Sequence, residues 1–165
     1  PLWSRGLGDV YKRQAVDLAL EDDEKILVEP EIVGKEVEIG VLHYADGTLL
    51  ASVPALLAGI DDSDEGFYGF DTKYLDNVVT AEIPAPFAPE LTEKLRDMAI
   101  RAFEALNCEG LSRVDFFVTK DSVYINEINT LPGFTPISMY PQVLAASGVE
   151  YPALLEALIE QALAK

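Results

Sequence analysis

The segment from residue 111 to 129 constrains the fold most, because it is typical of two strands joined by a tight turn. Side chains of a strand alternate between its two faces. One face of the first strand carries Leu111, Arg113, Asp115 and Phe117. Residues 120–122 form a plausible turn, and residues 123–128 indicate a second strand. On that strand, the face carrying Glu127 is predicted to hold Ile125, Glu127 and Asn129.

If the two strands pair as a hairpin, Asp115 lies beside Glu127 and Asn129 on one face. Cross-strand neighbours are roughly 4.5–5.5 Å apart at Cβ, so both carboxylates reach one small cation. Two carboxylates and an amide form an all-oxygen ligand set that suits Mg²⁺, or Mn²⁺. Arg113 would add a fixed cation, a clamp for phosphoryl oxygens. The alternative is a surface hairpin with solvated acids.

The loop that follows, residues 129–135, contains a Pro-Gly pair and can bring backbone N–H groups against an anionic ligand. The runs SRVDFF (112–117) and INEINTLPGFTPIS (125–138) match a longer pattern, in which N-T-x-P-G-x-T-x-x-S is intact. This pattern resembles the signature of the D-alanine–D-alanine ligases of the ATP-grasp superfamily. The resemblance covers roughly residues 15–165, the C-terminal portion of a full ligase.

The resemblance implies an α+β fold, the ATP-grasp C-terminal domain, with a mostly antiparallel sheet flanked by helices. It also implies a cytoplasmic ligase that joins two D-alanines through an acyl phosphate for peptidoglycan synthesis. The partners would be ATP and D-alanine, with Mg²⁺ (or Mn²⁺) as cofactor and a homodimer in the full-length enzyme.

The resemblance assigns roles to the residues of the hairpin and its loop. Arg113, Gly133 and Ser138 would be catalytic, and Asp115, Glu127 and Asn129 would bind the metal. Gly133, Ser138 and Met139 would form the floor for the second D-alanine. For Ser138, capping of the following helix is an equally good role.

Two earlier segments resemble the nucleotide site of the same family. Residues 26–42, ILVEPEIVGKEVEIGVL, match its strand, linker and strand, with strands predicted at 25–29 and 35–42. There Glu29 would meet the adenine and Glu36 the ribose hydroxyls, although each acid alone is typical of a solvated strand residue. Residues 65–74 resemble the mobile loop over ATP. The resemblance makes Lys73 and Tyr74 catalytic as well: Lys73 would face the terminal phosphate or the acyl phosphate, and Tyr74 the incoming amino acid. Gly69 departs from the commonly acidic residue.

The rest of the chain supplies ordinary elements. A hairpin turn at 45–48 leads into a strand at 49–53, and residues 55–64 are predicted to be a loop. A strand is expected at 77–84 and a helix from Pro89, with helices at 139–146 and 151–164. Residues 15–20 are typical of the last turns of a helix.

Charge and composition exclude several classes of function. The net charge of −17 argues against nucleic acid or an anionic membrane as a partner. The single cysteine, Cys108, excludes an internal disulfide and suits a reducing cytoplasm. Residues 1–14 show neither helical nor strand periodicity and resemble translated library-adapter sequence, so we expect a non-native segment there and the ATP-grasp domain at 15–165. A short natural N-terminal arm is the alternative.

The function expected from the sequence is therefore that of a D-alanine–D-alanine ligase fragment. We expect the chain alone to have no ligase activity, because the family's first-substrate half has no counterpart in it. One alternative is a ligase that accepts D-lactate or D-serine. Another, from a different class, is a non-catalytic acidic domain that only binds Mg²⁺ or nucleotide.

Overall fold

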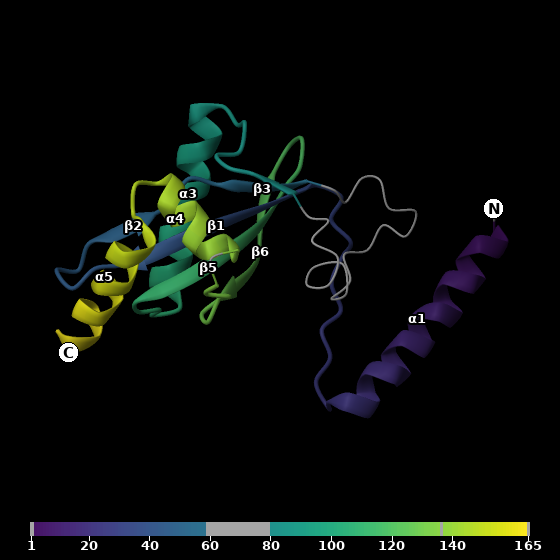
Figure 1. The fold of residues 1–165 in the computed structure, drawn as a ribbon. Coiled ribbons are helices and arrows are strands. Elements are labelled where there is room, and N and C mark those ends of the chain that lie inside the picture. The colour runs from purple at the N-terminus through teal and green to yellow at the C-terminus, as the bar shows by residue number, and fades with distance from the viewer. Residues whose placement is uncertain (1, 59–79, 136, 165) are drawn as a thin grey trace. The chain divides into compact units, whose positions relative to one another are not determined.

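The computed structural model describes residues 2–58, 80–135 and 137–164 (Figure 1). It contains two compact units, residues 1–32 and residues 33–165. The first unit holds helix α1 (Leu2–Asp22), followed by an irregular segment. None of the helices in the described parts is long and apolar enough to cross a membrane.

Helix α1 differs from the sequence prediction, because it runs through residues 2–14, which show no helical periodicity. A helix needs only local backbone hydrogen bonds, whereas periodicity marks a face that packs on a core. In its described part, α1 exposes apolar side chains, including Val10, Tyr11 and Leu18. The proposed boundary between residues 14 and 15 stays a prediction.

The predicted strand at 25–29 is wrong, because these residues have no strand structure. Leu27 and Val28 are exposed there. A strand is stable only when its backbone groups pair with a neighbouring strand, and apolar composition alone does not supply that neighbour.

The second unit is built on an antiparallel sheet that is six-stranded in the described residues. Its order is β4-β3-β1-β5-β6, with β2 paired to one end of β1 (Figure 1). The strands are β1 (Lys35–His43), β2 (Leu49–Ala51), β3 (Ala55–Ala58), β4 (Thr80–Glu82), β5 (Leu111–Val118) and β6 (Val123–Asn129). The expected fold class, a mostly antiparallel sheet flanked by helices, is confirmed.

Strand β3 lies where a loop is predicted. Its four residues, Ala-Leu-Leu-Ala, are too few to show alternation, but Ala55 and Leu57 are buried. β2 pairs with only one end of β1, and β3 pairs with the other end, from Val37 to Glu38. Tertiary pairing therefore makes this short segment a strand. Residues 59–64 and 77–79 of the predicted loop and strand lie outside the described residues.

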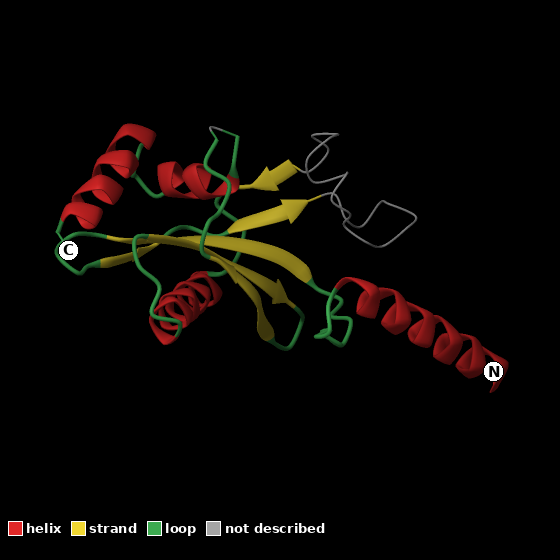
Figure 2. Ribbon diagram, turned by 90° about the horizontal axis from the view of Figure 1, so that it is seen from below, coloured by secondary structure: helices red, strands yellow, loops and turns green. Residues whose placement is uncertain are grey.

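Helices cover both faces of the sheet (Figure 2). Helix α3 (Pro89–Ala105) packs Leu95, Ala99 and Phe103 on one face, against a core that includes Val37, Ile39, Val114 and Phe116. Helices α4 (Met139–Ala146) and α5 (Tyr151–Leu163) lie on the other face and form a second core with Leu42 and Ala55. The predicted helices in these regions are confirmed within one residue at their ends.

Gly40 sets how closely α4 approaches β1. A Cβ at this position would lie 2.5 Å from Leu144 Cδ2 and 3.0 Å from Tyr140 Cδ2, and both side chains are fully buried. The Tyr140 hydroxyl donates a 3.0 Å hydrogen bond to the carbonyl of Val41, which holds the same contact. The absence of a side chain therefore lets α4 pack directly on the strand.

Gly40→Ala is expected to lower the free energy of unfolding by about 1–3 kcal/mol, because an overpacked core must shift to admit the methyl group. Denaturant unfolding of the chain measures this cost. The matched background is Leu144→Ala, which removes the nearest colliding atom, so Gly40→Ala should cost clearly less there. An equal cost in both backgrounds would contradict the close packing of α4 on Gly40.

Candidate functional site

The β5–β6 hairpin pairs as the alternation predicts. Asp115 lies directly opposite Glu127, and Arg113 lies opposite Asn129. Side chains directly opposite each other in an antiparallel pair share a face. The four polar side chains predicted to gather on one face therefore do so.

One detail of the predicted face is wrong, because the register shifts between Asp115 and Phe116. Phe116 pairs with Ile125, so Asn126 is an extra residue in β6. Ile125 therefore lies on the α3 side, near Met98 and Ala102, and not beside Glu127. A β-bulge of this kind turns neighbouring side chains locally, and both Asn126 and Glu127 line the same small cavity.

Arg113 is the central cation of this face. Its Nε donates a 2.7 Å hydrogen bond to Asp115 Oδ1, and its Nη2 donates a 2.7 Å hydrogen bond to Asp115 Oδ2. Its Nε also lies 3.2 Å from Glu38 Oε2 on the adjacent strand β1. The Arg113 side chain is only 10% exposed, so these ionic contacts lie largely out of water.

The surrounding acids keep Arg113 charged despite its burial. Burial alone would lower the pKa of Arg113, since it penalises the charged form. The hydrogen bonds to Asp115 and the charges of Glu38, Asp115 and Glu127 outweigh burial and raise that pKa. Arg113 is thus a permanent, oriented cation.

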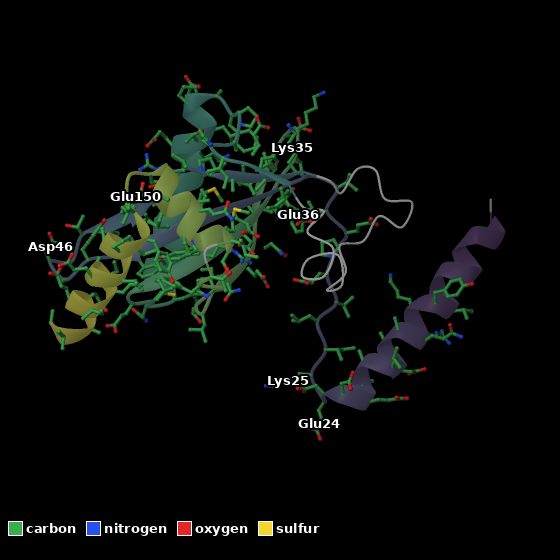
Figure 3. All side chains as sticks on the ribbon, in the orientation of Figure 1. Glu24, Lys25, Lys35, Glu36, Asp46 and Glu150 are labelled. Carbon is green, nitrogen blue, oxygen red and sulfur yellow. The ribbon has the colours of Figure 1, made fainter. Side chains whose placement is uncertain are left out.

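A cavity of about 60 Å³ lies beside Asp115 and Glu38, the two acids that contact Arg113, and it has room for a few water molecules or a small hydrated ion. Its acidic lining consists of Glu36, Glu38, Asp115 and Glu127. Figure 3 labels Glu36 at the start of β1 and Asp46 at the hairpin turn, so the cavity lies at the end of β1 away from that turn.

Sequence reasoning missed Glu38 as a residue of this site. Glu38 is buried, with a side chain 5% exposed, and lies opposite Asp115 in the β1–β5 register. The alternation in Glu36-Val37-Glu38 places both acids on one face of the strand. The sequence contains this alternation, but only the pairing of β1 with β5 shows that Glu38 lies opposite Asp115.

The donors on this face fit Mg²⁺. They are oxygens, and the Asp115 carboxylate keeps acceptor capacity beyond its two hydrogen bonds from Arg113. The Asn129 side-chain oxygen accepts a 3.2 Å hydrogen bond from the Leu131 N–H, so it caps the loop in this state. Among the described residues, no group of three or more His, Cys, Asp or Glu side chains is arranged to hold a metal.

The loop after β6 brings Gly133 and Ser138 together. A Cβ on Gly133 would lie 3.0 Å from Ser138 Oγ. Ser138 Oγ accepts a 3.0 Å hydrogen bond from the Thr135 N–H and lies 2.8 Å from Thr135 Oγ1. Ser138 occupies the N-cap position of α4, but its side chain makes no capping bond. Its hydroxyl therefore closes the loop.

The remaining predicted residues are Met139, Glu29, Lys73 and Tyr74. Met139 begins α4 and packs against the second core. Glu29 is exposed in the first unit, in a segment without strand structure. Lys73 and Tyr74 lie outside the described residues.

The family model described as the C-terminus of D-Ala–D-Ala ligase matches residues 9–160. The D-alanine–D-alanine ligase of Corynebacterium efficiens is 64% identical over 149 residues, which are 90% of this chain and 41% of that protein. The ligase of Nocardia farcinica is 52% identical over 151 residues, 92% of this chain and 42% of that protein. The chain thus spans about two fifths of these relatives.

Solved structures agree with this match. The D-alanine–D-alanine ligase from Coxiella burnetii superposes with a TM-score of 0.67 at 38% identity, over 82% of this chain and 33% of that one. The VanG D-Ala:D-Ser ligase from Enterococcus faecalis superposes at 0.63 and 29% identity, over 81% and 37%. Because the family model matches nearly the whole chain, the chain belongs to the D-Ala–D-Ala ligase C-terminus family.

Proposed function

We propose that this chain is the Mg²⁺- and nucleotide-binding part of an ATP-dependent D-alanine–D-alanine ligase. The observation that carries the proposal is the cavity that Glu36, Asp115 and Glu127 line, beside the fixed cation of Arg113. A Bacillus anthracis D-alanine–D-alanine ligase solved in complex with ATP superposes on the chain with a TM-score of 0.64 at 25% identity, over 82% of this chain and 40% of that one, which supports the nucleotide assignment.

In this proposal Asp115, Glu127 and Asn129 hold Mg²⁺. When bound, Mg²⁺ would neutralise charge on the phosphoryl oxygens of ATP and polarise them. Arg113 adds a second positive charge whose direction is set by Asp115 before any ligand arrives, so little reorganisation is required. Glu36, at the start of the same strand as Glu38, accepts hydrogen bonds from the ribose hydroxyls.

The loop that Ser138 closes forms the floor for the second D-alanine. The bonds between Ser138 and Thr135 hold the backbone near Gly133, and the missing Cβ of Gly133 leaves this space open. Backbone N–H groups of such a loop bind a carboxylate or a developing oxyanion. Gly133 and Ser138 therefore carry the catalytic role on this side, with Met139 beside them. The family resemblance alone assigns Lys73 to the phosphate, Tyr74 to the acceptor amino acid and Glu29 to the adenine.

D-Alanine is the favoured acceptor. Curated relatives from Corynebacterium and Nocardia that are 52–64% identical to this chain are named D-alanine–D-alanine ligases, which supports this acceptor. The homodimer and the cytoplasmic location follow from the family resemblance alone and stay predictions.

Glu127→Gln is expected to weaken Mg²⁺-dependent ATP binding by about tenfold or more, since a metal-ligating carboxylate loses its charge. Glu127 is exposed, so the free energy of unfolding should change by no more than about 0.5 kcal/mol. Calorimetry with ATP and Mg²⁺ measures the affinity. Glu104→Gln, an exposed acid on α3, is the matched control for net charge. Equal losses in both variants would reject the metal site, and absence of binding in the unmodified chain would reject the proposed function.

Asp115→Asn is expected to lower the free energy of unfolding by about 2 kcal/mol, because a largely buried arginine loses its charged acceptor. Denaturant unfolding measures the change. Asp97→Asn is the control, because Asp97 forms an exposed ion pair with Arg101 at 3.6 Å, which should contribute no more than about 0.5 kcal/mol. Similar losses at both positions would contradict the central role of the Arg113–Asp115 pair.

Ser138→Ala is expected to raise the KM for the acceptor D-alanine more than the KM for ATP, because it frees the Thr135 end of the loop. The measurement uses the Corynebacterium efficiens ligase with its matching segment exchanged for residues 15–164 of this chain. Ser122→Ala, in the exposed turn between β5 and β6, is the control. Equal increases in both constants for Ser138→Ala would count against the acceptor assignment.

A further inference from the structure

Glu38 is the acid of this face that has no assigned role. Its side chain is 5% exposed, and ionised carboxylates are seldom so deeply buried unless paired. It lies in the middle of β1, opposite Asp115 on β5 and beside Gly40, which lies opposite Arg113. Three strands therefore present Glu38, Asp115 and Glu127 side by side around one arginine.

The two carboxylate oxygens of Asp115 would have to bind both Arg113 and the metal ion. Both accept hydrogen bonds from Arg113 at 2.7 Å, and the proposed function requires Asp115 to ligate Mg²⁺. A divalent cation withdraws electron density from a carboxylate oxygen and repels a guanidinium beside it. Metal binding thus weakens the contact that orients Arg113.

Glu38 supplies a second anionic contact to the same guanidinium. Its Oε2 lies 3.2 Å from Arg113 Nε, on the side of β1 and not of β6. This contact is an ion pair, because the single Nε hydrogen of Arg113 is donated to Asp115. An ion pair in a site so poorly exposed is stronger than one in water.

We propose that Glu38 is a positioning residue, which holds the Arg113 guanidinium in place while Asp115 is engaged by a metal ion. The inference rests on the proposed function and adds a residue to it. Without metal, Asp115 and Glu38 share Arg113. With metal, Glu38 retains Arg113, so the arginine keeps its direction toward the phosphoryl oxygens when it is needed.

The test follows the Arg113 Nε–Hε proton by NMR in the whole chain with isotope-labelled arginine. The chain has five arginines, and Arg113→Lys identifies the signal. Exchange of this proton with water is measured without ligand and with saturating Mg²⁺ and ADP. The unmodified chain should exchange slowly in both states.

In Glu38→Gln, exchange should stay slow without metal, because Asp115 still accepts both bonds. It should become about tenfold faster with Mg²⁺ and ADP, because Asp115, the only acidic contact of Arg113 left among these two, then binds the metal. Glu104→Gln is the matched control for the loss of one negative charge: Glu104 is an exposed acid on α3 that does not line the cavity, so Arg113 exchange should match that of the unmodified chain in both states.

Thermal unfolding checks that each variant folds. If Glu38→Gln does not fold, Glu38→Asp replaces it, because this variant keeps the charge but shortens the side chain by one methylene group. The exchange rate of the Arg113 proton should then increase less, and only in the metal-bound state. An equal increase with and without metal, or none in either state, would overturn the positioning role while the proposed function stands. Failure of the unmodified chain to bind Mg²⁺ and ADP by calorimetry would overturn both.

Discussion

The paired guanidinium of Arg113 is the interaction on which this side of the molecule depends. A buried cation is costly unless anions surround it, and here the anions come from neighbouring strands. Asp115 lies on its own strand, Glu38 on β1 and Glu127 on β6. The pairing of β5 with both neighbours is therefore also the assembly of the site. Loss of either register would leave charges without compensation.

The two faces of the sheet serve different purposes. The α3 face carries the larger core, with Val37, Ile39, Val114 and Phe116. The other face is divided along β1. Leu42 and Gly40 meet α4, while Glu38 and Glu36 line the acidic cavity. On this face of β1, Gly40 packs against α4 and Glu38, two residues earlier, lines the cavity, because α4 covers only one end of the face.

Much of the site could be predicted from alternation alone. The spacing of Arg113, Asp115 and Glu127 requires only that two adjacent strands pair, and a short turn makes that pairing local. The β-bulge at Asn126 could not be predicted in this way, since an extra residue leaves the polar pattern of Glu127 and Asn129 intact. Glu38 was missed for a similar reason, because its neighbour in space lies far along the chain.

The sequence by itself determined the hairpin, the helices with apolar stripes and the family, because these follow from local periodicity and from a long ungapped motif. Tertiary structure decided the rest. Ala55–Ala58 is a strand because it pairs with β1, whereas residues 25–29, where three of the five residues are apolar, have no strand structure. Glu38 becomes part of the site because β1 pairs with β5 and excludes water from its carboxylate. Hydrogen bonds and ion pairs between distant segments form only when the chain is folded, and a one-dimensional pattern does not record them.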